Sequence, residues 1–195
     1  MLFATPSIAF DLDYTAARFE PAGDDAKAPE GWTDFCDRYG ASVCRTSESS
    51  PRDIDMTDAL WAELVQVNNW VNTWAQPQAD MQHWGVADRW DYPLDGHGDC
   101  EDYALLKQLI LISSGVPRED LLMTVVLANQ NEGHAVLTVH TNQGDFVLDS
   151  KRSDVEPWSR SAYSFVKRQS RSDPNYWVYI DGASSRSVLV ADSGE

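Results

Sequence analysis

One segment, residues 99–114, limits how this chain can fold more than any other. A helix is predicted from about Asp99 to Ser114, because Gly115 suits the position after a helix and Pro117 cannot continue one. Its apolar residues are Ala104, Leu105, Leu106, Leu109, Ile110, Leu111 and Ile112. They occupy nearly every side of the predicted helix, and such a helix must be covered on nearly every side. We therefore expect it at the centre of the fold.

A second long helix is predicted upstream, and an antiparallel sheet downstream. The apolar stripe of this helix has helical spacing and consists of Leu60, Leu64, Val67, Val71 and Trp74. Capping residues are available at Asp53, Asp55 and Thr57, and the helix should end before Pro77. Strands are predicted at 121–128, 134–140, 146–148 and 176–180, with a turn at 142–144. Helices followed by strands indicate an α+β fold.

The remaining segments are predicted to be less regular. Residues 1–31 show no clean period and indicate an irregular lead-in, and residues 182–195 indicate a polar tail. Residues 32–181 then form one domain, with a short helix or turn at 32–45 and a loop at 76–98. The first ten residues are mildly apolar without a basic start, and we expect them to be the remnant of a signal peptide.

The charge of the chain excludes one class of partner. Its formal net charge is −16, so it offers no basic surface for the phosphates of a nucleic acid. Basic partners and Ca²⁺ suit such a surface better, although the charge can also serve only solubility. No apolar run approaches the roughly 18 residues of a membrane span.

The three cysteines divide into a pair and a single residue. Cys36 and Cys44 lie close together in a polar segment, whereas Cys100 stands far away in a different context. A disulfide between the first two is the natural division and indicates an oxidising compartment, with two free thiols as the alternative.

Cys100 stands in surroundings that conflict with its chemistry. It lies at the start of the central helix, where a thiolate is stabilised, but between Asp99 and Glu101, with Asp102 next. Like charge from these carboxylates should raise the pKa of the thiol. Hard oxygen ligands clustered in this way suit Ca²⁺, which would neutralise them. The alternative is that the acids only complement the positive end of the helix.

A base and an orienting acid for Cys100 are available in the predicted hairpin. A thiol nucleophile needs a base to take its proton and a third group to orient that base. If residues 142 and 143 are the central residues of the turn, His134 lies opposite residue 151. Asp149 is then a diagonal neighbour of His134 on the same face. This geometry predicts Cys-His-Asp catalysis, against the alternative of a buried structural cysteine.

The predicted loop at 76–98 is rich in aromatic residues. Trp84 and Trp90 are expected either to line a substrate cleft, with an indole N–H near the reacting carbonyl, or to cover a satellite core.

Three motifs in order carry a resemblance to a known family. They are GDCEDYA at 98–104, GHAVL at 133–137 and GDFVLD at 144–149, preceded by Trp84-Gly85 and by DRW at 88–90. In these the chain resembles the bacterial transglutaminase-like cysteine proteinases, the LapG-like periplasmic proteases, from about Trp32 to Ile180.

The resemblance implies a fold, an activity and partners. It implies a papain/transglutaminase-like fold with Cys100 as nucleophile, His134 as base and Asp149 as orienting acid. It implies a Ca²⁺ site with ligands among Asp99, Glu101 and Asp102. The implied function is periplasmic cleavage of a large surface adhesin at a paired-alanine site, which controls biofilm attachment. The implied partner is an inner-membrane cyclic di-GMP receptor of the LapD type. Transglutaminase-like acyl transfer and a non-catalytic, calcium-dependent peptide-binding module remain the alternatives.

Overall fold

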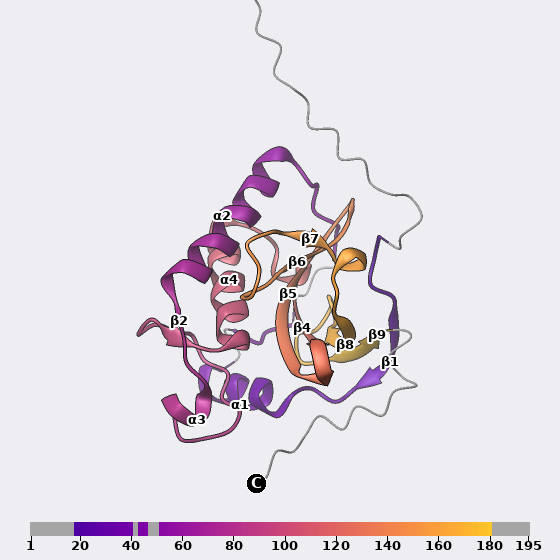
Figure 1. Ribbon diagram of the computed structural model, residues 1–195. Helices are drawn as coiled ribbons and strands as arrows, with labels where there is room; N and C mark the ends of the chain where they lie inside the picture. Colours follow the sequence, from indigo (N-terminus) through magenta and orange to yellow (C-terminus); the bar gives the residue numbers. More distant parts are fainter. Residues whose placement is uncertain (1–17, 41–42, 47–50, 181–195) are drawn as a thin grey trace, which may run out of the picture.

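The computed structural model describes residues 18–40, 43–46 and 51–180, and its main element is a seven-stranded antiparallel sheet (Figure 1). In order across the sheet, the strands are β1 (Ala22–Ala26), β9 (Trp177–Ile180), β8 (Ser164–Gln169), β4 (Leu121–Leu127), β5 (Gly133–Thr141), β6 (Gly144–Leu148) and β7 (Glu156–Pro157). The predicted α+β fold with an antiparallel sheet is confirmed.

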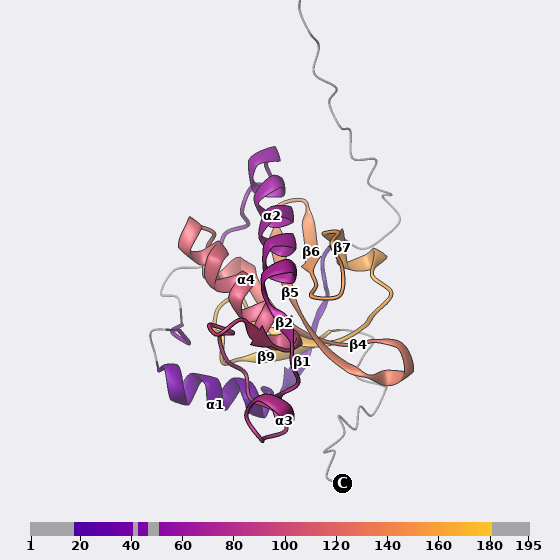
Figure 2. The same ribbon diagram turned by 60° about the vertical axis from the view of Figure 1, so that its left-hand side comes forward.

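Four helices accompany the sheet. They are α1 (Glu30–Tyr39), α2 (Asp58–Trp74), α3 (Asp80–His83) and α4 (Cys100–Ser114). A small parallel pair, β2 (Gln76–Pro77) and β3 (His97–Gly98), lies beside the start of α4 (Figures 1 and 2). Single 3₁₀ turns occupy 118–120, 129–131 and 158–160.

Helix α4 occupies the central position that its apolar sequence requires. It packs against β5 on one side and against α2 on the other (Figure 2). Its burial is greatest in the first half, where every residue from Glu101 to Gln108 is buried. Toward its end Leu109 and Ile112 are more than a third exposed, at 36% and 37%. The strongest packing therefore surrounds the end of the helix that carries Cys100.

Helix α2 begins and ends where the sequence predicts. Thr57 caps it by accepting the N–H of Leu60 at 3.1 Å, and it ends before Pro77. The predicted apolar stripe is wrong at its last position. Trp74 is exposed and stacks on Trp70. The buried face of α2 includes Asn68 but does not include Trp74.

Five of the described strands were not predicted from the sequence: the two-residue strands β2, β3 and β7, and the longer strands β1 and β8. Strand β1 lies within the predicted irregular lead-in, because AGDDA has no β-favouring residues and is extended only by pairing with β9. Strand β8 lies in a segment for which no strand was predicted, and it fills the position between β4 and β9. The predicted signal-peptide remnant and polar tail lie outside the described residues.

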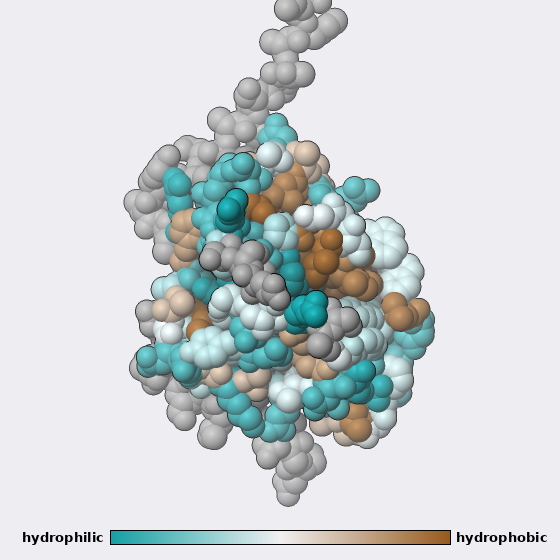
Figure 3. Space-filling model, turned by 180° about the vertical axis from the view of Figure 1, so that it is seen from behind, coloured by the Kyte–Doolittle hydropathy of each residue, from teal (hydrophilic) through white to brown (hydrophobic). Residues whose placement is uncertain are grey.

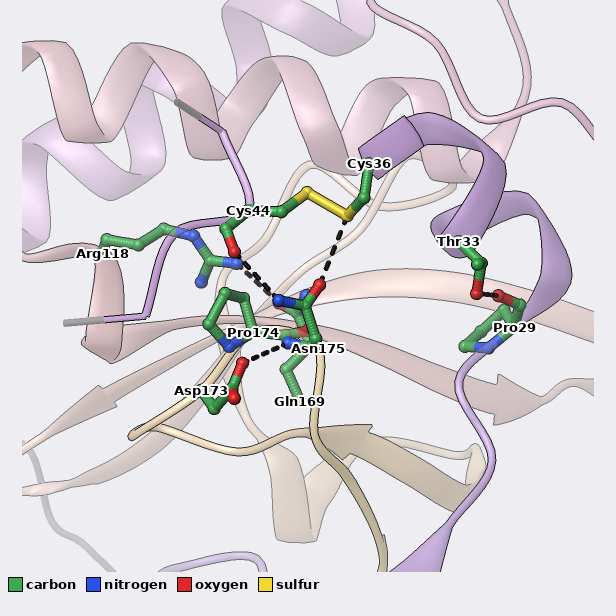
Figure 4. Close-up of a disulfide and its surroundings, with 9 residues drawn as sticks. All are labelled: Pro29, Thr33, Cys36, Cys44, Arg118, Gln169, Asp173, Pro174 and Asn175. Carbon is green, nitrogen blue, oxygen red and sulfur yellow. Dashed lines mark hydrogen bonds between the residues drawn. A yellow bond between two sulfur atoms is a disulfide. The ribbon is translucent and has the colours of Figure 1, made fainter. Parts of the chain in front are cut away.

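The predicted disulfide is present and connects α1 to the short segment 43–46 that follows it. Cys36 and Cys44 are bonded, with their Cα atoms 5.7 Å apart (Figure 4). Asn175 donates from Nδ2 to the carbonyl oxygen of Cys44 at 2.9 Å, and its Oδ1 lies 3.5 Å from the sulfur of Cys36. The disulfide and the hydrogen bond from Asn175 together hold α1 against the turn before β9.

Polar residues separate the apolar patches on the face opposite to that of Figure 1 (Figure 3). Among the described residues, no helix has the length and apolar character needed to cross a membrane.

Candidate active site and metal centre

Cys100 lies where the central helix meets the sheet. It is the first residue of α4, directly after the capping position of Asp99. The backbone N–H of Ala135 on β5 points at its sulfur, with a nitrogen–sulfur distance of 3.4 Å. The thiol is therefore held beside the strand that carries His134.

The hairpin of β5 and β6 has the predicted register. Thr141 pairs with Gly144 and Leu137 pairs with Leu148, which continues to place His134 opposite residue 151. Asp149, directly after β6, reaches His134 with 2.7 Å between Nε2 and Oδ1. Both side chains are buried, at 1% exposure each. The ring nitrogen Nδ1 of His134 is left without a hydrogen-bond partner in the described part of the chain.

Both carboxylate oxygens of Asp149 accept hydrogen bonds. Its Oδ2 accepts the hydroxyl of Tyr163 at 2.6 Å, and its Oδ1 accepts the backbone N–H of Lys151 at 3.0 Å. Burial by itself would raise the pKa of this carboxyl, but the hydrogen bonds from His134, Lys151 and Tyr163 outweigh it and lower the pKa to about 2. Asp149 is therefore a permanent anion that holds the proton of His134 on Nε2.

The thiol of Cys100 has the opposite environment. It donates to Oε2 of the neighbouring Glu101 at 3.1 Å. Burial, followed by the charge of Glu101, raises the pKa of the thiol well above its ordinary value. The conflict predicted from the sequence is thus present in the fold: without a neutralising charge, burial and then Glu101 favour the protonated thiol.

Acidic side chains gather at this end of α4 in a cluster of five. Its members, here called the acidic cluster, are Asp80, Asp88, Asp99, Glu101 and Asp102. In two groups, carboxylate oxygens from three residues lie within 4.8 Å of one another, namely Asp80 with Asp88 and Glu101, and Asp80 with Asp99 and Asp102. Asp80 belongs to both groups and is the centre of the cluster.

The carboxylates of the acidic cluster repel one another, and all of them except that of Asp88 are at least partly buried. Burial and the neighbouring carboxylates raise the pKa of Asp80 to about 6 and that of Asp102 to about 8, against hydrogen bonds from backbone N–H groups, which lower both values. Burial also raises the pKa of Asp99 and of Glu101. Oδ1 of Asp80 and Oδ1 of Asp99 are buried without a partner among the described residues. Hard oxygen donors in this arrangement fit a cation such as Ca²⁺.

The acidic cluster is assembled by the short β2–β3 pair. Backbone bonds from Gln76 to Gly96 and from Gln78 to Gly98 bring the start of α3 beside the start of α4. The N–H of Asp80 then lies 3.3 Å from Oδ2 of Asp99. Asp102 is held by the N–H of Asp91 at 2.7 Å. Asp80 and Asp88 were not predicted, because only this tertiary pairing moves the loop against the helix.

The two tryptophans expected to line a substrate cleft have different positions. Trp84 is 40% exposed, with the guanidinium of Arg89 over its ring at 4.4 Å. Trp90 is 4% exposed and packs among Trp32 and Trp177, and its indole N–H donates to Asp88. Trp90 therefore fits the second of the two expected roles, that of covering a core, because the loop folds inward at this point.

Comparison with known proteins gave a family match and solved structures of similar fold. The profile of a family described as bacterial transglutaminase-like cysteine proteinase BTLCP matches residues 22–185. A calcium-bound structure of Legionella pneumophila LapG is 24% identical, with a TM-score of 0.53 over 75% of each chain. Another structure of that protein is 25% identical, with a TM-score of 0.51 over 78% of this chain and 79% of the other. A search of curated proteins gave no significant match.

Proposed function

The chain belongs to the bacterial transglutaminase-like cysteine proteinases and is a cysteine protease, and on that premise we propose that Cys100, His134 and Asp149 are its catalytic residues. The observation that carries this proposal is the bond between His134 and Asp149 at 2.7 Å, beside a strand whose next N–H touches the Cys100 sulfur. With Nε2 engaged by Asp149, the unpaired Nδ1 is free to act as the base.

In the proposed mechanism each residue has one task. His134 takes the thiol proton through Nδ1, and the sulfur of Cys100 attacks the scissile carbonyl carbon. The proton then passes from His134 to the leaving amine, while Asp149 stabilises the imidazolium and its orientation. The backbone N–H of Cys100 at the helix start is the proposed donor to the oxyanion. Water, activated by the same imidazole, releases the acyl group from the sulfur.

We propose that the acidic cluster binds Ca²⁺. The donor set supports this, because five carboxylates converge and two of their buried oxygens have no partner within the described residues. The bound ion would supply the positive charge that lowers the pKa of the neighbouring thiol. Asp99, Glu101 and Asp102 were expected as ligands, and Asp80 and Asp88 are now added to the proposed set. Glu101, once engaged as a ligand, would release the thiol of Cys100 toward His134.

The proposed substrate is a large secreted or surface adhesin, cleaved in the periplasm to control biofilm attachment. The resemblance to the LapG-like proteases supports it, and the Cys36–Cys44 disulfide is consistent with an oxidising compartment. A cyclic di-GMP receptor of the LapD type is the proposed partner on the same grounds. A neighbouring gene for either protein would support this pathway.

The catalytic proposal is tested with a quenched fluorescent peptide that contains an Ala-Ala bond. We expect C100A and H134A to abolish cleavage while both variants keep the wild-type melting temperature within a few degrees. Cleavage by C100A at the wild-type rate would contradict the proposed catalytic role of Cys100. Adding a primary amine separates the two chemistries, because acyl transfer gives an amide product that hydrolysis does not.

The calcium proposal is tested separately with a chelator. EGTA should lower both the melting temperature and the cleavage rate, and added Ca²⁺ should restore them. A ligand at 100 times its Kd stabilises the folded state by about 2.7 kcal/mol, which is easily measured. An unchanged melting temperature and rate in EGTA would contradict the proposed metal site and leave the proposed catalytic residues standing.

A further inference from the structure

Tyr163 contacts both members of the pair formed by His134 and Asp149. Its hydroxyl donates to Oδ2 of Asp149 at 2.6 Å. Its ring lies against the imidazole of His134, with 5.4 Å between the ring centroids and 59° between the ring planes. Together with the bond of 2.7 Å between His134 and Asp149, these contacts join the three side chains in a closed triangle. The proposed mechanism gives Tyr163 no task of its own.

The sheet brings Tyr163 to this place. Strand pairing puts Phe165 of β8 opposite Val126 of β4, and Val126 opposite His134 of β5. Tyr163 comes two residues before Phe165, directly before β8 begins. Its ring packs against the small apolar cluster to which Phe165 and Val126 belong. Three neighbouring strands therefore hold Tyr163 beside His134, so that its position is set by the sheet.

The hydroxyl of Tyr163 binds the oxygen of Asp149 that His134 does not touch. Oδ1 accepts from Nε2 of His134 and from the backbone N–H of Lys151, whereas Oδ2 accepts from Tyr163. The last torsion of an aspartate side chain is soft, so a carboxylate held through one oxygen can turn about its Cβ–Cγ bond. Hydrogen bonds to both oxygens fix its plane. Burial, followed by the hydrogen bond to Asp149, raises the pKa of Tyr163, so the phenol stays protonated and keeps donating.

We propose that Tyr163 is a positioning residue for the protease reaction: its hydroxyl fixes the plane of the Asp149 carboxylate, and its ring fixes the tilt of the His134 imidazole. This inference rests on the proposed catalytic role of His134 and Asp149. The unpaired Nδ1 of His134 then keeps one direction, which a base needs in order to take the proton of a nearby thiol.

A tyrosine that serves only stability would behave differently. The bond from Tyr163 to Asp149 also ties the two ends of the segment between β6 and β8 together, and this is the alternative role. Y163F separates the two roles, because it removes the hydroxyl and keeps the ring. A role in stability predicts a lower melting temperature with an unchanged kcat for the folded enzyme. A positioning role predicts a lower kcat at an unchanged KM.

The first test measures kcat and KM of Y163F with the Ala-Ala peptide, in Ca²⁺ and well below the melting temperature. We expect kcat to fall roughly 10- to 100-fold, as for a small misplacement of a reacting group, and KM to change little. Y176F is the matched control. The hydroxyl of Tyr176 donates to Asp25 on β1, at the far edge of the sheet, so this variant should keep the wild-type kcat. A wild-type kcat for Y163F would refute the proposal.

The second test reads the state of His134 without turnover, by NMR of isotope-labelled histidine in the whole protein. Y163F should shift the Nε2 signal of His134, because the carboxylate that it binds is no longer fixed. His140 is the internal reference, since it is bonded to Asp145 at 2.6 Å on the same hairpin and should keep its signal. An unchanged Nε2 signal of His134 in Y163F would also contradict the positioning role.

A double variant separates this inference from the proposed function. In a D149N background, Y163F should change kcat little further, because the hydroxyl acts through Asp149. Full activity of D149N would refute the proposed catalytic role of Asp149. A strongly impaired D149N together with a Y163F enzyme of wild-type kcat would refute only the role of Tyr163. If Y163F and Y163H both fail to fold, Tyr163 is a stability residue and the positioning proposal is overturned.

Discussion

The two sides of the candidate active site differ in how well their charges are satisfied. On the hairpin side, Asp149 receives three hydrogen bonds and its pKa falls to about 2. On the helix side, the acidic cluster combines several carboxylates with raised pKa values, and two of its buried oxygens lack partners within the described ranges. The hairpin side is complete, because both oxygens of its carboxylate accept hydrogen bonds, whereas the helix side is incomplete, because two of its buried carboxylate oxygens accept none within the described residues.

This difference indicates how the site is controlled. A carboxylate that accepts hydrogen bonds from the protein itself is held in its working position without a ligand. Buried carboxylates without such donors need a ligand that neutralises them, and a divalent cation is the proposed ligand. The proposed base and the proposed orienting acid are thus preorganised, whereas the proposed nucleophile depends on the acidic cluster beside it.

The largest expected effect comes from breaking the complete side. D149N should lower kcat by about 10³ to 10⁴, because the orientation and charge support of His134 are lost. Added Ca²⁺ should not restore it, since the defect is not at the acidic cluster. D145N is the matched control: Asp145 holds His140 at 2.6 Å on the same hairpin, and its loss should leave kcat near that of the wild type. Rescue of D149N by Ca²⁺ would contradict the division into two sides.

The next effect comes from weakening the incomplete side. D80N removes the shared member of both carboxylate groups and should weaken Ca²⁺ binding by about 10- to 100-fold. Activity at limiting Ca²⁺ should fall accordingly and should recover at high Ca²⁺, as measured by calcium titration of the cleavage rate. D37N, which changes an exposed carboxylate of α1, should titrate like the wild type. Identical titrations for D80N and the wild type would remove Asp80 from the proposed site.

A smaller effect should follow from adding one methyl group beside the acidic cluster. A Cβ at Gly98 would lie 2.6 Å from Oδ2 of Asp102 and 2.8 Å from its Cβ. G98A should therefore displace Asp102 and destabilise the protein by about 1–3 kcal/mol in denaturant unfolding. G133A, next to His134, meets no atom within 4 Å and should change stability by less than about 1 kcal/mol. Equal effects of the two variants would mean that the close approach at Gly98 is not tight.

The smallest effect is a pH dependence of stability that Ca²⁺ should remove. Asp80 and Asp102 have folded pKa values of about 6 and about 8, above the ordinary value of 3.8, so the folded state binds protons more tightly than the unfolded state. In EGTA the melting temperature should therefore rise as the pH falls from about 8 toward 5. With Ca²⁺ bound, this slope should flatten, and the difference between the two curves isolates the acidic cluster from other titrating groups. A slope that is equal with and without Ca²⁺ would contradict the assignment.

Local sequence was sufficient for the elements that depend on neighbours in the chain. The bounds of α2 and α4 follow from Thr57, from Asp99 and from Gly115, which act within one turn of the helix. The register of the β5–β6 hairpin follows from its two-residue turn, and it places Asp149 diagonal to His134. These predictions succeeded because the interactions that decide them span only a few residues.

The tertiary structure decided what depends on contacts between distant segments. Strand β1 exists only through β9, and Trp90 is buried only because its loop folds against Trp32. Asp80 joins Asp99 only through the β2–β3 pair, and Lys107 is buried only because α4 packs on the sheet. The sequence alone determined the central helix, its nucleophile candidate and the partner hairpin, since periodicity, caps and turns act locally. Burial and the convergence of like charges are properties of the folded chain, so the five-member acidic cluster and the buried lysine could be identified only in the tertiary structure.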